Sequence, residues 1–262
     1  RDKVGLVSTS LNTHPQAASL FAEITTRNLK IAPPSLRAGL VTPDLTEALA
    51  ASGVRGVTLA PETGSERLRA EAGKHVPNSV ILEDVRSLVS AGIRDIKLYF
   101  MVGLPGEGAP ELEETIDMVK RVRQVFIHVS RGNRRIGTVH VSLATFVPKP
   151  HTAYERRPMI APEEATRRIR RIVRSLAGLP NVRVSVEGPK WSYLQAVVSR
   201  GDRRLFGLLA DLAGRDPSTW HRVMRHWHLN PDHFALRDRD EDEILPWSYV
   251  HRFPAAGACH GQ

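Results

Sequence analysis

Short apolar runs alternate with longer amphipathic segments along most of this chain, and this alternation restricts its fold more than any other feature. We expect the short runs to be strands, at 3–8, 29–34, 54–60, 96–102, 138–146 and 182–186. Helical patterns separate them, at 15–28, 43–51, 80–91, 111–125 and 162–177. Strands that alternate with helices at this spacing indicate βα units and a parallel sheet. The sequence therefore predicts an α/β protein.

The pattern changes near residue 150, and we expect the domain organisation to change there too. Five predicted strands precede that point, an odd count that suits a partial barrel without its first βα unit. We therefore expect barrel strands 2 to 6 within residues 1–150. Residues 151–252 are predicted to be a mainly helical extension that packs on the barrel, with helices near 191–199, 203–213 and 218–227. The tail at 253–262 is predicted to be disordered.

The composition limits the expected location of the protein but does not identify the class of molecule that it binds. Lys and Arg number 37 against 28 for Asp and Glu, giving a net charge of +9. This balance is compatible with RNA, nucleotides or acidic substrates, and equally with arginines spread over solvated helices. There is no long uncharged apolar run and no signal peptide, so we expect a cytoplasmic protein without a membrane span. The chain begins with Arg instead of Met, which we interpret as a truncation.

Polar and glycine-rich segments follow three of the predicted strands. They are 33–37 (PPSLR), 60–69 (APETGSERLR) with Gly73 and Lys74 shortly after, and 97–107 (KLYFMVGLPGE). In parallel sheets, functional groups gather where strands end. A ligand with a carboxylate, an amine, a ribose and a flat base needs cations, an acceptor and close backbone approach. Arg37 or Lys74 suits the carboxylate, Glu62 the amine and Gly103 the flat ring. Taken singly, Gly103 also suits an ordinary tight turn and Glu62 the start of a helix.

Taken together, these segments are specific. APETGSERLR…GK followed by IKLYFMVGLPGE resembles radical S-adenosylmethionine (SAM) enzymes of the branch related to methylthiotransferases and Elongator-type proteins. The likeness is strongest to uncharacterised radical SAM proteins that often carry a cobalamin-binding domain. PSLRAGL, FVPKPHT, SRGDRR and EILPW fit the same group, so the resemblance extends from about residue 3 to 250.

The resemblance implies a fold, a reaction and a set of site residues. The fold is a partial (β/α)6 TIM-like barrel, and the cofactors are SAM and a [4Fe–4S] cluster, with cobalamin as a further candidate. Reductive cleavage of SAM gives a 5′-deoxyadenosyl radical, here for methylation or methylthiolation of an unknown substrate with the help of an electron donor. Glu62 is expected to face SAM and Lys74 to meet its carboxylate. The other expected cofactor-binding residues are Ser35, Arg37, Tyr99, Met101 and Gly103.

The chain departs from the family at the cluster. The family holds its cluster with three cysteines in a C-x3-C-x2-C pattern, whereas the one cysteine here is Cys259. We therefore assign no metal ligand and expect the cluster ligands to lie upstream of Arg1. This polypeptide alone is predicted to be unable to cleave SAM, and no residue is assigned as catalytic.

A non-catalytic alternative follows from the arginine-rich helix predicted at 162–177. Arg167, Arg170, Arg171 and Arg174 share one face of that helix, which suits phosphate groups. The chain would then be a barrel remnant that binds RNA or a protein partner. A solvated outer helix explains the same pattern.

Overall fold

The computed structural model of the chain describes residues 3–8, 10–131 and 136–250, and these ranges contain two parallel sheets. The chain packs as two units, Arg1–Phe146 with Pro162–Ser192, and Val147–Ala161 with Tyr193–Gln262. The predicted α/β fold with parallel strands is confirmed in the first unit. The predicted disordered tail and Cys259 lie outside the described residues.

The strands of the first unit follow the chain order expected of βα units. A two-stranded sheet pairs β1 (Lys3–Gly5) with β2 (Lys30–Ala32). The second sheet has the order β3-β4-β5-β6, with bounds Gly56–Glu62, Asp95–Val102, Thr138–Thr145 and Val182–Val186. The helices between them are α1 (Ala17–Thr26), α2 (Pro43–Ala51), α3 (Glu66–Glu71), α4 (Asn78–Ser90), α5 (Ala109–Ser130) and α6 (Pro162–Leu176), with a 3-10 turn η1 (Leu11–Thr13).

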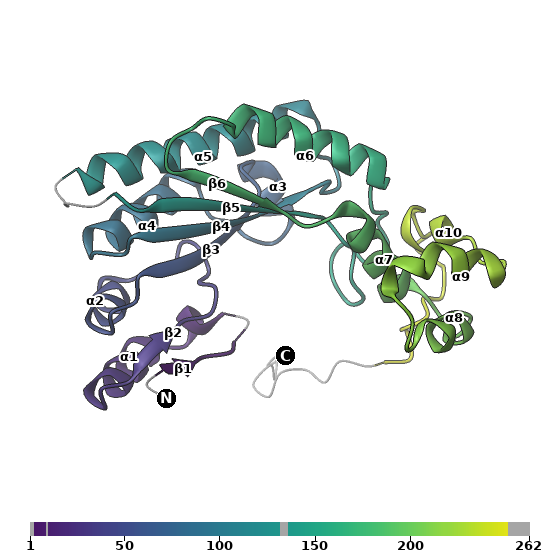
Figure 1. Cartoon of the computed structure of the whole chain (residues 1–262), viewed down its shortest axis with the longest axis horizontal. Helices are drawn as coiled ribbons and strands as arrows, with labels where there is room; N and C mark the ends of the chain where they lie inside the picture. The colour runs from purple at the N-terminus through teal and green to yellow at the C-terminus, as the bar shows by residue number, and fades with distance from the viewer. Residues whose placement is uncertain (1–2, 9, 132–135, 251–262) are drawn as a thin grey trace, which may run out of the picture. The chain divides into compact units, whose positions relative to one another are not determined.

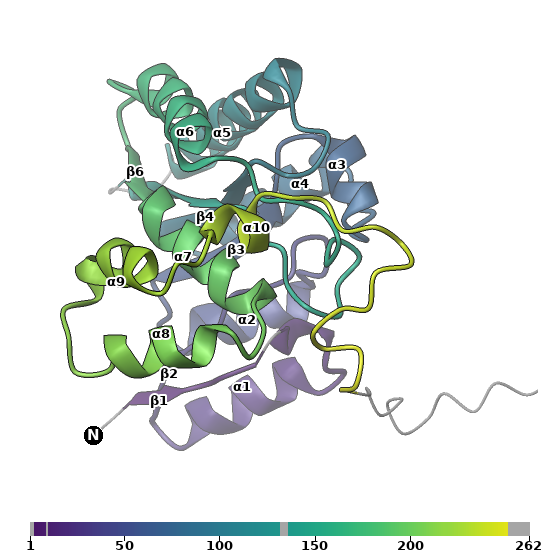
Figure 2. The ribbon, with the colours of Figure 1, turned by 90° about the vertical axis from the view of Figure 1, so that its right-hand side faces the viewer.

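The sheet β3–β6 has one buried and one more open face. In β4 the even-numbered residues from Ile96 to Val102 are buried, whereas the odd-numbered residues from Asp95 to Met101 are partly or fully exposed. Because side chains alternate along a strand, the buried set points to the helices that contribute to the same core. Figure 1 shows α5 and α6 running along this face, and Figure 2 shows the layers from the side.

The start of β3 differs from the predicted start, and the cause is a glycine that the sequence shows. The strand predicted at 54–60 is β3, which begins two residues later at Gly56. Gly53 ends α2 in the left-handed conformation (φ 67°), and the Val54 amide donates back to the carbonyl of Leu49. Val54 therefore belongs to the helix cap, as is common after a C-terminal glycine.

The pattern change at residue 150 falls in the first segment of the second unit, but α6 and β6 return to the first. Val139 to Leu143 of β5 pair with Val182 to Val186 of β6. The second unit is mainly helical, as expected for the extension. Its elements are α7 (Pro189–Arg200, most of which lies in this unit), α8 (Leu205–Leu212), η2 (Pro217–Thr219), α9 (Trp220–His226) and α10 (Pro231–Ala235). No helix in the described ranges is long and apolar enough to cross a membrane.

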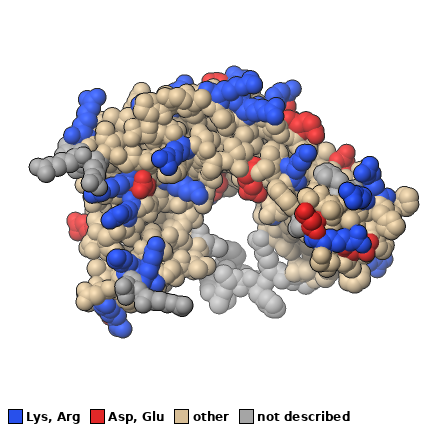
Figure 3. Space-filling model, in the orientation of Figure 1, with Lys and Arg blue, Asp and Glu red and all other residues tan. Residues whose placement is uncertain are grey.

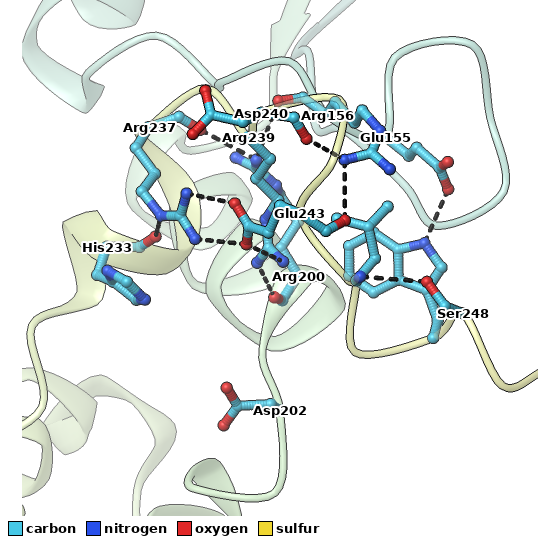
Figure 4. A network of polar contacts seen from close by, with 12 residues as sticks. Glu155, Arg156, Arg200, Asp202, His233, Arg237, Arg239, Asp240, Glu243 and Ser248 are labelled. Carbon is cyan, nitrogen blue, oxygen red and sulfur yellow. Dashed lines mark hydrogen bonds and ion pairs between the residues drawn. The ribbon is translucent and has the colours of Figure 1, made fainter.

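A buried arginine organises the second unit (Figure 4). Arg200 is fully buried and donates to the backbone carbonyls of Ala235 (2.9 Å), Arg237 (3.0 Å) and Arg156 (3.4 Å). Burial, with the nearby Arg239 and Arg237 cations, lowers the pKa of Arg200 to about 10. Arg200 of the SRGDRR motif thus links its own helix to the segments around Arg156 and around Ala235 to Arg237.

The EILPW motif is tied into the same network. Glu243 accepts from both terminal nitrogens of Arg237 (2.7 and 2.6 Å), and Arg239 donates to the carbonyl of Arg200 (2.5 Å). At the far end of the motif, Trp247 Nε1 donates to Glu155 (2.7 Å). The two motifs that the sequence singled out without a role therefore hold the second unit together.

Candidate functional site

A cavity of about 450 Å³ opens where β3 ends, and it gathers most of the predicted site residues. Its walls come from three loops, from the end of β3 and from β4. Five of the seven predicted residues line it, namely Ser35, Arg37, Glu62, Lys74 and Tyr99, together with Ser10, Leu36, Ala60, Ala72 and Gly73. Met101 and Gly103 are not among the lining residues.

Glu62 and Lys74 form an ion pair in the wall of this cavity. Lys74 Nζ lies 2.5 Å from Glu62 Oε1, and the two side chains are only 28% and 22% exposed. The regular pairing of β3 with β4 shifts between Leu59 and Glu62, and Glu62 adopts a left-handed backbone conformation (φ 67°). A non-glycine residue in this region costs about 1 kcal/mol or more. Strand β3 therefore ends in a strained conformation at Glu62, with its carboxylate directed toward the Lys74 ammonium.

The buried Arg69 fixes the loops on which this pair stands. Its guanidinium donates to the carbonyls of Pro61 (3.0 Å), Thr63 (2.5 Å) and Val76 (2.6 Å). The first two flank Glu62 and the third follows Lys74. Sequence reasoning missed Arg69, because an arginine in a short charged helix normally reads as a surface residue.

Asn12 positions the loop that carries Arg37. Its side chain accepts from the Arg37 amide (2.9 Å) and donates to the carbonyls of Arg37 (2.8 Å) and Leu40 (3.1 Å). Leu36 forms an isolated parallel bridge with Leu59, so this loop lies beside β3. These contacts explain how segments that are far apart in the sequence meet at one cavity.

Ser10 is a cavity residue that the sequence did not reveal. Its hydroxyl oxygen is buried and has no hydrogen-bond partner among the described residues. A buried hydroxyl without a partner indicates a place for a polar ligand group or an ordered water. No sequence signal distinguishes Ser10 from other loop serines.

Tyr99, Met101 and Gly103 occupy the end of β4. Tyr99 is 38% exposed and lies on the open face of the sheet, with Met101 two residues further along that face. Gly103 begins the turn after the strand with φ 92°, a conformation that favours glycine. Its amide donates to Glu107 Oε2 at 2.6 Å. The GLPGE segment is thus a turn closed by its own glutamate.

Arg168 of α6 completes that turn and is, like Arg69 and Ser10, a residue whose role the sequence did not predict. It donates to the carbonyl of Glu107 (2.8 Å) and to Glu107 Oε2 (3.1 Å). Burial raises the pKa of Glu107, while the Gly103 amide and Arg168 oppose the rise. Arg168 therefore anchors α6 to the turn after β4.

The other arginines of α6 are only partly available to a partner. Lys and Arg side chains gather over α5 and α6 in Figure 3. Arg167 pairs with Glu164 and Arg171 with Glu113 (2.7 Å), whereas Arg170 and Arg174 have no ion pair within the described part of the chain. Of the four arginines in the predicted stripe, Arg171 therefore links α6 to α5, and Arg167 pairs within α6 itself.

No metal centre is formed by the part of the chain that the structure describes, because no three metal-ligating side chains gather there. Cys259, the one cysteine of the sequence, lies outside the described ranges. These 262 residues therefore do not supply the three thiolates of a [4Fe–4S] site.

Comparison with known proteins relates the first unit to one superfamily. The family model described as "Radical SAM superfamily" matches residues 7–119. An uncharacterized protein of Methanocaldococcus jannaschii is 30% identical over 204 residues, which is 78% of this chain and 42% of that protein. The chain thus spans less than half the length of this relative.

A solved structure shares the fold. Coproporphyrinogen III oxidase from Escherichia coli, described as a radical SAM enzyme, superposes with a TM-score of 0.51 at 11% identity. The match covers 67% of this chain and 40% of that enzyme. At this identity the likeness shows the fold, a parallel α/β architecture of TIM-like type.

Proposed function

We propose that the chain is part of a radical SAM protein, as its match to that family model over residues 7–119 suggests, and that the cavity at the end of β3 binds S-adenosylmethionine for a radical reaction. The superfamily in general uses SAM together with a [4Fe–4S] cluster. The whole protein would then be a SAM-cleaving enzyme, and this domain would contribute its cofactor-binding half.

The observation that supports this proposal best is the Glu62–Lys74 pair in the cavity wall. The methionyl end of SAM is a zwitterion with an ammonium and a carboxylate. Glu62 can accept from that ammonium, while Lys74 and the nearby Arg37 can bind the carboxylate. Before binding, Glu62 and Lys74 pair with each other, and after binding each pairs with the opposite charge of the methionyl group. No charge is therefore left unpaired in either state.

The remaining lining suits the nucleoside. The unpartnered hydroxyl of Ser10 and that of Ser35 are suited to ribose hydroxyls. Tyr99 offers an aromatic surface in the same cavity, and aromatic rings stack on flat bases. Met101 and Gly103 lie further along β4 and would border the nucleoside without lining the cavity itself.

The cluster does not fit the residues of this chain, so the proposal is confined to binding and orienting SAM. A cluster that serves this cavity would take its thiolates from residues beyond these 262. In the part we describe, the tasks left for this chain are to hold the methionyl group, shape the nucleoside site and exclude water.

The motif resemblance adds a finer proposal about the reaction. It favours a methylation or methylthiolation type of modification, with cobalamin as a candidate second cofactor. Product analysis by mass spectrometry with the full-length protein tests this, because a methyl and a methylthio group differ by a sulfur atom. A product that carries neither group would contradict it.

Direct binding of SAM to the chain tests the proposed function. We expect Lys74→Gln and Glu62→Gln to weaken SAM binding about tenfold each, the typical loss of one charge-assisted hydrogen bond. Isothermal titration calorimetry measures this. Lys120→Gln and Glu83→Gln, on exposed helix positions away from the cavity, are matched controls and should bind SAM as the wild type does. Equal affinity in all five proteins would overturn the assignment.

A further inference from the structure

The open face of the sheet β3–β6 carries a line of cationic and imidazole side chains. Lys97 of β4, His140 of β5 and Arg183 of β6 are register partners on neighbouring parallel strands. Residues in register on adjacent strands share a face and lie about 4.8 Å apart, so the three positions span about 10 Å. We call these three residues the basic row.

The basic row has no acidic partner within the described ranges. None of its members makes an ion pair or a side-chain hydrogen bond there, whereas most arginines of α6 do. The contact of Lys97 is with an aromatic ring, because its Nζ lies 4.8 Å from the centre of the Tyr99 ring. Lys97 and His140 are partly buried and Arg183 is exposed.

A bound anion would stabilise such an arrangement. Two like charges at about 10 Å repel each other, and partial burial weakens the screening by water. Ammonium, imidazole and guanidinium groups together offer several donors to one carboxylate or phosphate. The next level of the same face is polar and neutral, since Tyr99 is in register with Ser142 and Ser142 with Ser185.

Tyr99 connects the basic row to the cavity. It lines the cavity with Glu62 and Lys74, and the same ring contacts the Lys97 ammonium. Two residues along a strand correspond to about 7 Å, so a group held by the row lies within a small molecule's length of the cavity. An anion on the row would place the rest of its molecule beside Tyr99 and the serines.

We propose that the basic row binds the carboxylate or phosphate group of a small anionic substrate. This assignment rests on the proposed SAM site, because it treats the molecule on the row as the substrate of that site. It names the substrate class, which the SAM-binding residues leave open. The short span of the row and its place inside the sheet face favour a compact molecule.

Ring resonances of His140 in the full chain test the assignment. Inorganic phosphate and acetate are the probes, at one fixed pH and ionic strength, and the His140 signal is identified by its loss in His140→Gln. We expect both ions to shift it, and the stronger of the two identifies the group that the row prefers. In Lys97→Gln and Arg183→Gln, binding should weaken about tenfold.

Controls separate the row from general charge and from the SAM site. Arg174→Gln on α6 should leave the titration unchanged, and amide spectra of each variant establish that it is folded. Two results would overturn the assignment of an anion site to the basic row: a His140 signal that neither ion shifts, or Lys97→Gln and Arg183→Gln variants that bind the ions as tightly as the wild type does. A short single-stranded RNA that binds more tightly per phosphate than the free ion would overturn the small-molecule class. No SAM is present in this titration, so a negative result would not bear on the proposed SAM site. For the same reason, Lys74→Gln should bind phosphate and acetate as the wild type does.

Discussion

Asp84 shows how a single buried carboxylate supports the site from a distance. It accepts from the Gly39 amide at 2.5 Å and thereby holds the loop that follows Arg37. Burial is the main cause that raises the pKa of Asp84 to about 6, and backbone hydrogen bonds from Gly39 and Val41 oppose the rise. The loop is thus held by the Asp84 carboxyl, whose pKa is higher in the folded than in the unfolded protein.

The pH dependence of stability follows from this shift. Between about pH 4 and pH 6 the folded state binds more protons at Asp84 than the unfolded state, so stability falls as the pH rises through that window. The loss from Asp84 amounts to about 3 kcal/mol and is nearly complete about one unit above pH 6. Asp84→Asn keeps an acceptor for Gly39 and does not titrate. Urea unfolding from pH 4 to 8 should therefore show the variant gaining stability over the wild type up to about pH 7, with a constant difference above. A difference that does not change with pH would contradict the assignment.

Residues of the site differ in how far sequence could predict them. Glu62 and Lys74 could be predicted, because polar groups that follow parallel strands meet at one edge of the sheet. Asn12 and Arg69 could not, since each acts on backbone atoms of segments that only the fold brings together. The lining role of Ser10 likewise depends on a buried position that no pattern marks.

At the scale of elements, the turn after β3 packs closely against α5. The Gly64 amide donates to Thr115 Oγ1 (3.0 Å), and a Cβ on Gly64 would lie 2.3 Å from Thr115 Cα. Such an approach is possible only for glycine, because the obstructing atoms belong to the helix backbone. The position of α5 and that of the Glu62 turn are therefore coupled.

Gly64→Ala tests this coupling. We expect the free energy of unfolding to fall by about 1–3 kcal/mol, the usual range for overpacking, and SAM binding to weaken because the Glu62 turn shifts. Gly5→Ala is the matched control, since a Cβ there meets no atom within 4 Å. Urea denaturation and calorimetry give both quantities. A Gly64→Ala protein as stable as the wild type would show that the turn and helix are not in firm contact.

At the scale of the whole molecule, the two units owe their stability to different forces. The first has a large apolar core on one face of its sheet, whereas the second combines a smaller core with the Arg200 network. The alternation of strands and helices predicted the first unit well. The sequence also predicted helices in the second unit, but it could not predict the Arg200 network, because a buried arginine bonded to three carbonyls carries no periodic signal.

Arg200→Met should therefore destabilise the second unit selectively. Three carbonyls lose their donor, that of Ala235 in a buried bond and the other two in partly buried bonds, and removal of one partner from a buried charged network costs about 3–5 kcal/mol. Trp220, Trp227 and Trp247 all lie in this unit, so tryptophan fluorescence reports chiefly on it. We expect an earlier fluorescence transition in urea, with unchanged hydrogen exchange at Leu98 in the core of the first unit. Arg203→Met, at an exposed position, is the control, and equal transitions in both variants would refute the role of Arg200.

The most direct test of the central claim compares SAM with 5′-methylthioadenosine, which keeps the nucleoside but lacks the amino acid end. Calorimetry of the wild type and Lys74→Gln gives the ratio of the two affinities in each protein. If Glu62 and Lys74 bind the methionyl zwitterion, Lys74→Gln lowers the affinity for SAM about tenfold and leaves that for methylthioadenosine unchanged. Equal losses for both ligands, or no loss for either, would contradict the assignment of this cavity to SAM.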